Sequence, residues 1–151
     1  YPDANFTMRL TYGSVQDYQP ADGVTYNYYT TLDGVMAKYK PGDWEFDVPK
    51  DLIKLWENKD YGRYADKNGD LVVNFITTND ITGGNSGSPV IDAQGNLIGL
   101  AFDGNWEAMS GDIAFENEVQ RTICMDTRYL LFIIDKMANA QNLMQELKII
   151  Q

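Results

Sequence analysis

One serine between glycines is the residue of this sequence best placed for covalent chemistry. Ser86 stands within the run Gly83-Gly84-Asn85-Ser86-Gly87-Ser88-Pro89-Val90. Glycines permit the tight turn that exposes a hydroxyl group and directs backbone amides into one small space, as an oxyanion hole requires. The run therefore predicts a nucleophile at Ser86. A glycine-rich β-turn with an incidental serine uses the same residue types and is the alternative.

The base that such a serine needs is missing from this chain. The 151 residues contain no histidine, which is the usual general base beside a serine nucleophile. None of the eight lysines stands at a recognisable Ser-Lys spacing from Ser86. Cys124 has no histidine to activate it, so we expect a buried apolar thiol rather than a second nucleophile. The isolated chain should therefore be inactive.

Two β-rich segments after Ser86 would position it. Residues 88–92 and 96–103 are joined by Ala93-Gln94-Gly95, where the glycine can adopt the positive φ of a hairpin turn. A serine turn followed directly by a hairpin, with 97–102 as the returning strand, resembles the order found in chymotrypsin-like serine peptidases. A chance turn would not need this hairpin, so the hairpin favours the nucleophile interpretation.

The rest of the chain is predicted to be mostly β, with helices at two places. Alternating or β-branched and aromatic residues predict further strands, which cover residues 6–12, 24–31, 71–77 and 120–125. Pro49 can open a short helix that stops at Gly62. A C-terminal helical tail spans about residues 126–147, with Asp126 as its cap and a break near Asn139. A β-barrel closed by this tail is the expected architecture.

Composition and charge exclude several classes of function. Twelve basic and 22 acidic residues give a net charge of -10, which opposes binding to nucleic acid or to an anionic membrane surface. A single cysteine excludes an internal disulfide framework and a multi-cysteine metal site. Residues 66–70 resemble the opening of a calcium loop, but Thr77 stands where the bidentate carboxylate is needed, so we expect a turn. We expect no metal, no cofactor and no membrane span, and the length suits one domain.

Several longer runs resemble one family. Residues 78–89, 102–110 and 126–132, together with 1–7, are similar to the C-terminal portion of bacterial dipeptidyl-peptidases of the 7 and 11 types, which are chymotrypsin-like serine exopeptidases. In that family a large helical domain is inserted in a double β-barrel, and the catalytic His and Asp lie upstream of it. The resemblance implies that residues 1–151 are the C-terminal half of the double barrel with its helical tail. Peptide substrates and the upstream part of the same polypeptide are then the expected partners.

The resemblance also implies roles for individual residues. Ser86 would be the nucleophile, and the amides of Gly84 and Ser86 would form the oxyanion hole. Asp103 matches the acidic residue that pairs with the free α-ammonium of the substrate. Gly104 stands where the 11 type carries arginine and the 7 type carries glycine, so the resemblance favours the 7 type. It then implies substrates with a hydrophobic penultimate residue, which is the second residue from the N-terminus of the peptide. It further implies a periplasmic or outer-surface location in a Gram-negative bacterium and permits a homodimer of the longer protein.

Alternatives remain for these assignments. Asp103 could be a strand-end aspartate satisfied by backbone amides, and Gly104 could serve only a positive φ. Asn85 replaces the aspartate that precedes the nucleophile in trypsin-like enzymes, so we do not expect activation by a newly cut N-terminus. Asp80 lies six residues before Ser86, where trypsin selects basic side chains, but we expect it to accept backbone hydrogen bonds in its loop. The alternative function is a non-catalytic β-barrel module that binds peptides along its 97–104 edge.

Overall fold

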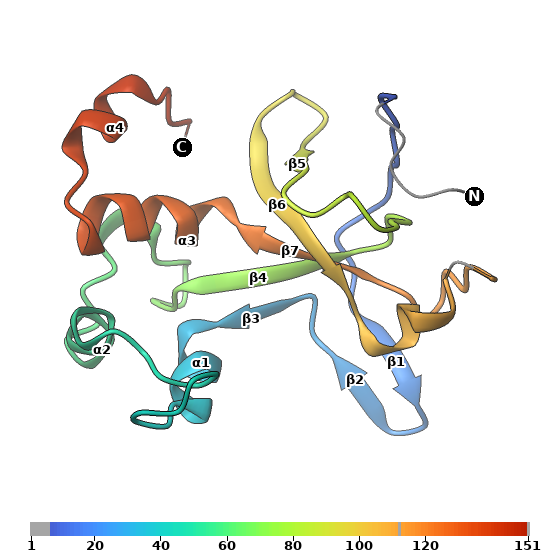
Figure 1. Ribbon diagram of the computed structural model, residues 1–151, viewed down its shortest axis with the longest axis horizontal. Helices are drawn as coiled ribbons and strands as arrows, with labels where there is room; N and C mark the ends of the chain where they lie inside the picture. Colours follow the sequence, from blue (N-terminus) through green and yellow to red (C-terminus); the bar gives the residue numbers. More distant parts are fainter. Residues whose placement is uncertain (1–6, 112, 151) are drawn as a thin grey trace. The chain divides into compact units, whose positions relative to one another are not determined.

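A computed structural model describes residues 7–111 and 113–150 (Figure 1). By its internal contacts the chain divides into two compact units. The barrel unit contains residues 7–29 and 74–126, and the helical unit contains residues 30–73 and 127–150. All of the residues singled out above for chemistry lie in the barrel unit.

The principal sheet has five strands, with β3 (Tyr29–Thr31) at one edge and β5 (Pro89–Ile91) at the other. Between them lie β4 (Val72–Thr77), β7 (Thr122–Asp126) and β6 (Leu97–Gly104), in that order (Figure 1). A separate hairpin joins β1 (Tyr18–Ala21) to β2 (Val24–Tyr26) through Gly23 at positive φ. This arrangement brings the strand that follows Ser86 and the strand that returns from it to one edge of the sheet.

The pairing of β6 with β7 contains a bulge close to the residues predicted to bind substrate. Ala101 pairs with Cys124 and Asp103 pairs with Ile123, so Phe102 is an extra residue in β6. A bulge of this kind locally increases strand twist and redirects a side chain or carbonyl group. The barrel unit's core cluster, which includes Phe75, Ala101 and Cys124, anchors the sheet just before the bulge.

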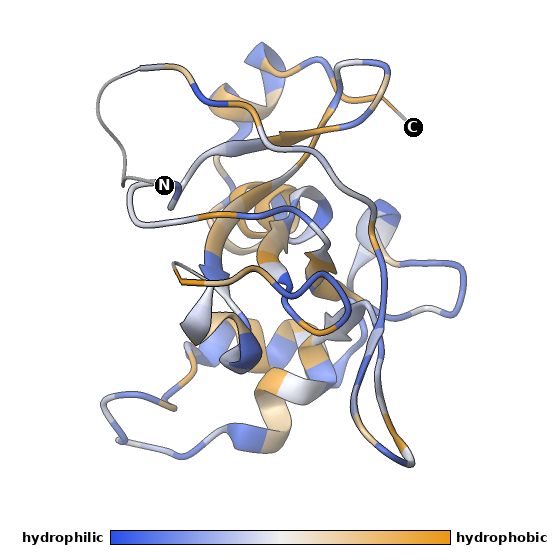
Figure 2. Ribbon diagram, turned by 90° about the vertical axis from the view of Figure 1, so that its right-hand side faces the viewer, coloured by the Kyte–Doolittle hydropathy of each residue, from blue (hydrophilic) through white to orange (hydrophobic). Residues whose placement is uncertain are grey.

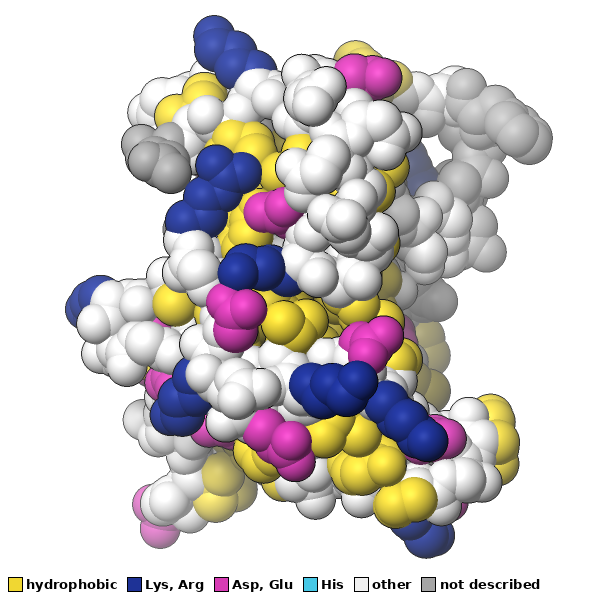
Figure 3. Space-filling model, turned by 90° about the vertical axis from the view of Figure 1, so that its left-hand side faces the viewer, with side chains coloured by type: hydrophobic (Ala, Val, Ile, Leu, Met, Phe, Trp, Pro, Cys, Tyr) yellow, Lys and Arg dark blue, Asp and Glu magenta, His cyan; other side chains and the backbone are white. Residues whose placement is uncertain are grey.

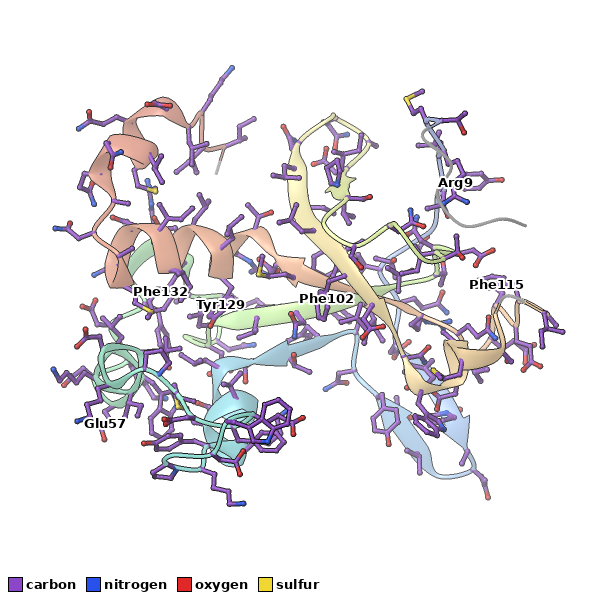
Figure 4. The ribbon with its side chains drawn as sticks, viewed as in Figure 1. Arg9, Glu57, Phe102, Phe115, Tyr129 and Phe132 are labelled. Atoms are coloured by element: carbon purple, nitrogen blue, oxygen red, sulfur yellow. The ribbon has the colours of Figure 1, made fainter. Side chains whose placement is uncertain are left out.

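The helical unit packs around one phenylalanine of its C-terminal helix. Its helices are α1 (Leu32–Lys38), α2 (Lys50–Glu57), the 3-10 turn η1 (Gly62–Tyr64), α3 (Thr127–Phe132), the π-helical turn η3 (Ile133–Met137) and α4 (Gln141–Glu146). Phe132 is fully buried, with Tyr61 and Tyr64 edge-on to its ring and Tyr129 stacked on it. Figure 4 shows Tyr129 and Phe132 on the same helix. Lys136 adds an ion pair of 2.6 Å with Asp60.

Hydropathy is mixed along these elements, as expected for helices with one buried face. Figure 2 shows apolar and polar residues in the same helical segments. The face in Figure 3 mixes acidic and basic side chains, with apolar side chains between them. No helix in residues 7–111 and 113–150 is long and apolar enough to span a bilayer. Within the same residues there is no cluster of three or more metal-ligating His, Cys, Asp or Glu side chains.

Most predicted elements are present, with shifted ends. The hairpin after Ser86 is confirmed, with Gly95 at φ 84° in its turn. Strand 71–77 is β4 and strand 120–125 is β7. Pro49 precedes α2 as predicted, and Asn139 has a positive φ of 47° between η3 and α4. Asp66 makes the expected turn, accepting hydrogen bonds from the amides of Asn68 and Asp70.

Three expectations about secondary structure were wrong in detail, and one helix was missed. The strand predicted over 6–12 is not formed at residues 7–12, where Met8, Leu10 and Tyr12 are exposed; Phe6 lies outside the described residues. The predicted strand 24–31 is divided into β2 and β3. Helix α2 ends at Glu57 rather than Gly62, because Lys59 already has a positive φ. Helix α1 was not predicted at all.

Cys124 provides a test of the packing in the barrel unit. Its side chain is completely buried, and desolvation raises the pKa of the thiol to about 11. In the unfolded chain the thiol has an ordinary pKa near 8.5 and loses its proton first, so this residue's contribution to stability falls as pH rises from about 8.5 to 11. We expect negligible alkylation of Cys124 at pH 8 and full alkylation after unfolding, measured by mass spectrometry of its peptide. Rapid native labelling at pH 8 would contradict the buried position.

Candidate active site

The loop that carries Ser86 is closed by hydrogen bonds centred on Asn85. The Asn85 amide donates to the carbonyl of Thr82 at 3.2 Å, and the Thr82 amide donates to Asn85 Oδ1 at 3.0 Å. The Ser88 amide donates to the carbonyl of Asn85 at 2.9 Å. Gly84 and Gly87 have φ values of 93° and 82°, which glycine adopts without the steric cost of a side chain. Asn85 therefore fixes the loop locally, in place of the aspartate of trypsin-like enzymes.

Strand β6 holds this loop from the other side. The Gly87 amide donates to the carbonyl of Ala101 at 2.7 Å, and the Ala101 amide donates to the carbonyl of Ser88 at 3.0 Å. The exposed Ser86 hydroxyl donates to the carbonyl of Phe102 at 3.1 Å. Figure 4 labels Phe102, the bulged residue, on β6. The hydroxyl thus lies beside the strand that ends in Asp103 and Gly104.

Two backbone amides next to this hydroxyl have no partner. Among residues 7–111 and 113–150, neither the Gly84 nor the Ser86 amide donates a hydrogen bond. Both residues are exposed, so water or a ligand can reach them. Unpaired amides two positions apart in the sequence, one of them belonging to the serine itself, are donors that an oxyanion hole can use. The oxyanion-hole role of Gly84 and Ser86 stays a prediction, with which their exposed, unpaired amides are compatible.

The end of β6 carries the other two candidate residues. Asp103 is exposed, and its Oδ1 accepts a hydrogen bond of 2.8 Å from the Gly104 amide. Its Oδ2 accepts none from the part of the chain described, so one carboxylate oxygen is available to a cation. Gly104 does not have a positive φ. The alternative that Gly104 serves only such a backbone conformation is therefore wrong.

Sequence reasoning missed a buried network directly behind Gly104. The Asn105 amide donates to the carbonyl of Arg121, and the Arg121 amide donates back to Asn105 Oδ1. Asn105 Nδ2 donates to Glu107 Oε2 and to the carbonyl of Val119, both at 2.8 Å. The hydroxyl of Tyr18 also donates to Glu107 Oε2 at 3.1 Å. In the sequence, this hydrogen-bonded network is indicated only by the position of Asn105 directly after Gly104.

The Arg121 guanidinium joins two segments of the barrel unit, residues 16–18 and residues 117–120. The residue is only 2% exposed, and burial lowers the pKa of the guanidinium, although arginine keeps its charge at neutral pH. Its donors reach backbone carbonyls rather than a carboxylate, and these belong to Gln16, Asp17, Asn117, Glu118 and Gln120. Its charge also lies over the Tyr18 ring at 5.5 Å. Arg121 therefore fixes the segments on either side of the β6 end.

Asp80 does not have the role expected of it. Its carboxylate accepts no hydrogen bond from the residues described, and only its backbone amide is engaged, donating to Thr11 Oγ1 at 3.2 Å. Asp80 instead borders an open hollow of about 530 Å³, which is also lined by Leu10, Tyr12 and Phe115. Neither Ser86, Asp103 nor Gly104 lines that hollow. The expectation that the Asp80 carboxylate accepts backbone hydrogen bonds in its loop is therefore wrong for the described residues.

Comparison with known proteins identifies the family. The model of the family Peptidase S46 matches residues 1–149. The chain belongs to this family. It is 61% identical over 150 residues to Dipeptidyl-peptidase 7 of Phocaeicola vulgatus, covering 99% of this chain and 21% of that protein. It is 56% identical over 151 residues to the Asp/Glu-specific dipeptidyl-peptidase of Capnocytophaga gingivalis, covering 100% of this chain and 21% of that protein.

Solved structures agree with the family assignment. The crystal structure of Porphyromonas endodontalis DPP11 in complex with the dipeptide Arg-Glu is 54% identical, with a TM-score of 0.91. The match covers 95% of this chain and 20% of that chain. The expected mostly β, chymotrypsin-like fold with short helices is confirmed. The chain spans about a fifth of the length of these relatives.

Arg121 can be tested separately from catalysis. In the full-length S46 protein, Arg121→Ala should leave several backbone carbonyls without donors and lower the local opening free energy by about 3 kcal/mol or more. Hydrogen exchange on peptides covering residues 16–18 and 117–121 measures this effect. The matched control is Arg63→Ala, because exposed Arg63 donates only to the Tyr64 hydroxyl at 3.3 Å. Equal protection in the Arg121→Ala variant and the parent would show that Arg121 does not hold these segments.

Proposed function

We propose that this chain supplies the nucleophile, the oxyanion hole and part of the specificity pocket of a serine-type dipeptidyl-peptidase. The observation that carries the proposal is the exposed Ser86 hydroxyl beside the unpaired amides of Gly84 and Ser86. Membership of a family whose matched relatives are named dipeptidyl-peptidases supports release of N-terminal dipeptides. The full enzyme also needs the upstream part of the same polypeptide, which supplies the general base.

The reaction follows from these groups. Ser86 Oγ attacks the carbonyl carbon of the second residue of the peptide, while a histidine outside this chain takes the hydroxyl proton. The resulting oxyanion accepts hydrogen bonds from the Gly84 and Ser86 amides, each worth roughly 3 kcal/mol in a comparable protease. The same histidine then protonates the leaving amine, which leaves a dipeptidyl ester on Ser86. Water hydrolyses this ester and releases the dipeptide.

Asp103 and Gly104 would determine which peptides react. The unoccupied Asp103 Oδ2 can pair with the α-ammonium of a free N-terminus, so the enzyme would measure two residues from that end. Gly104 adds neither charge nor bulk, which suits an aliphatic or aromatic penultimate side chain. Overall identity separates the two specificities only weakly, because relatives named Dipeptidyl-peptidase 7 match at 56–61% and Asp/Glu-specific relatives at 52–56%. We therefore base the hydrophobic preference on Gly104.

A non-catalytic peptide-binding module is the second candidate. An extended peptide could add only to the β6 segment after Ala101, without any chemistry at Ser86, because β5 and the Ser86 loop already pair with residues 97–101. The unpaired amides favour catalysis over this alternative, because strand addition does not require them. We also propose a periplasmic or outer-surface location in a Gram-negative bacterium and a homodimer of the longer protein, both from the family resemblance.

The missing base leads to a prediction about the chain alone. The full-length protein should cleave a dipeptidyl chromogenic substrate and react with a fluorophosphonate probe at Ser86. Residues 1–151 alone should do neither, because a serine hydroxyl is a weak nucleophile without a nearby base. Full-length Ser86→Ala is the control for the site of labelling. Robust turnover by residues 1–151 alone would refute this account, and full-length protein without turnover would favour the binding module.

Asp103 leads to a second prediction. In the full-length enzyme, Asp103→Asn should raise KM and lower kcat/KM by about 10- to 100-fold for peptides with a free amine, since a charge-assisted hydrogen bond contributes about 1.5–3 kcal/mol. Asp22→Asn removes the same charge from the exposed β1–β2 turn and should leave kcat/KM unchanged. Steady-state kinetics and the thermal midpoint decide the outcome. Unaltered kcat/KM in a folded Asp103→Asn protein would make Asp103 a structural strand-end residue.

A further inference from the structure

Gly104 has an unusually close neighbour in the turn that follows it. A Cβ atom added to Gly104 would lie 2.9 Å from Ala108 Cβ, closer than two such atoms approach in real proteins. The next atom, the carbonyl oxygen of Arg121, is 3.9 Å away and would not clash. Since the backbone of Gly104 is not at positive φ, Ala108 is the one obstacle to a Cβ atom there among the described residues.

The turn that contains Ala108 cannot move away without breaking hydrogen bonds. Ala108 belongs to the 3-10 turn η2 (Trp106–Ser110), which follows β6 directly in Figure 1. Its amide donates to the carbonyl of Asn105 and its carbonyl accepts from the amide of Gly111, both at 2.9 Å. Glu107, the residue before it, is held by Asn105 and Tyr18 as described above. Ala108 Cβ is therefore attached to a fixed backbone.

We propose that Ala108 is a second specificity-determining residue, which acts together with Gly104 as one steric unit. This inference rests on the proposed function and extends it. While a methyl group occupies position 108, position 104 has to remain glycine, and the enzyme is restricted to penultimate side chains that need no charged partner. A cationic side chain at position 104, which would recognise acidic penultimate residues, requires the Ala108 methyl to be removed as well.

A double-mutant cycle in the full-length enzyme tests this pairing. The variants are Gly104→Arg, Ala108→Gly, their combination, and Gly104→Arg combined with Ala108→Ser, which retains the Cβ atom. The substrates are two dipeptidyl anilides that differ only in a penultimate Leu or Asp. Thermal midpoints and kcat/KM are measured for each variant. The serine combination is the matched control, because it changes residue 108 without relieving the contact.

The pairing predicts strong coupling between the two positions. Gly104→Arg alone should lower the thermal midpoint and cleave both substrates poorly. Adding Ala108→Gly should restore the midpoint and raise kcat/KM for the Asp substrate about tenfold or more over Gly104→Arg alone, whereas adding Ala108→Ser should do neither. If Gly104→Arg fails to fold, Gly104→Ala with and without Ala108→Gly gives the same cycle in the thermal midpoint, because alanine adds only the Cβ atom.

Two different failures can be distinguished. Additive effects on both the midpoint and kcat/KM, in an enzyme that releases dipeptides, would overturn the pairing and leave the proposed function intact. Rescue by Ala108→Ser equal to that by Ala108→Gly would also overturn it, because the Cβ contact would then not be the cause. Absence of dipeptide release by the unaltered full-length protein would overturn the proposed function and the specificity role that rests on it.

Discussion

The backbone hydrogen bonds between the Ser86 loop and β6 are the interaction on which the candidate site depends. The Gly87 amide and the Ser88 carbonyl are both joined to Ala101, two residues before Asp103. These bonds fix Ser86, the proposed nucleophile, relative to the strand that would bind the substrate's ammonium group. The bulge at Phe102 then directs its carbonyl to the Ser86 hydroxyl. The proposed nucleophile and the proposed recognition residues thus share one short stretch of hydrogen-bonded backbone.

The end of β6 is supported by buried polar groups, in addition to the apolar cluster that packs against Ala101. Asn105 and Arg121 exchange hydrogen bonds, and the Arg121 guanidinium satisfies carbonyls from segments far apart in the sequence. Such a fully hydrogen-bonded network rigidifies the structure, because any displacement leaves a buried polar group unpaired. Ala108 is held in place because its amide donates to the carbonyl of Asn105, a member of this network. Ala108 therefore cannot move aside for a side chain at position 104, and glycine is the residue that fits there.

The sequence predicted the turns, because their conformation depends on the residue types within the turn itself. Gly95 and Asn139 both have the positive φ that their turn positions suggested. Residues 7–12 show the limit, because alternation predicted a strand there, but a strand also requires a hydrogen-bonded neighbour that the pattern cannot identify. The role of Arg121 was unpredictable for a similar reason, since its partners at Gln16 and Asp17 are more than 100 residues away.

The central claim is that Ser86 attacks while the Gly84 and Ser86 amides hold the oxyanion. The most direct measurement is a crystal structure of the full-length enzyme inactivated by a dipeptidyl phosphonate, whose tetrahedral phosphorus mimics the reaction intermediate. The account predicts a covalent bond from phosphorus to Ser86 Oγ, with a phosphonyl oxygen about 2.7–3.1 Å from both amide nitrogens. Phosphorus bound to another residue, or its oxygen directed away from both amides, would contradict the account.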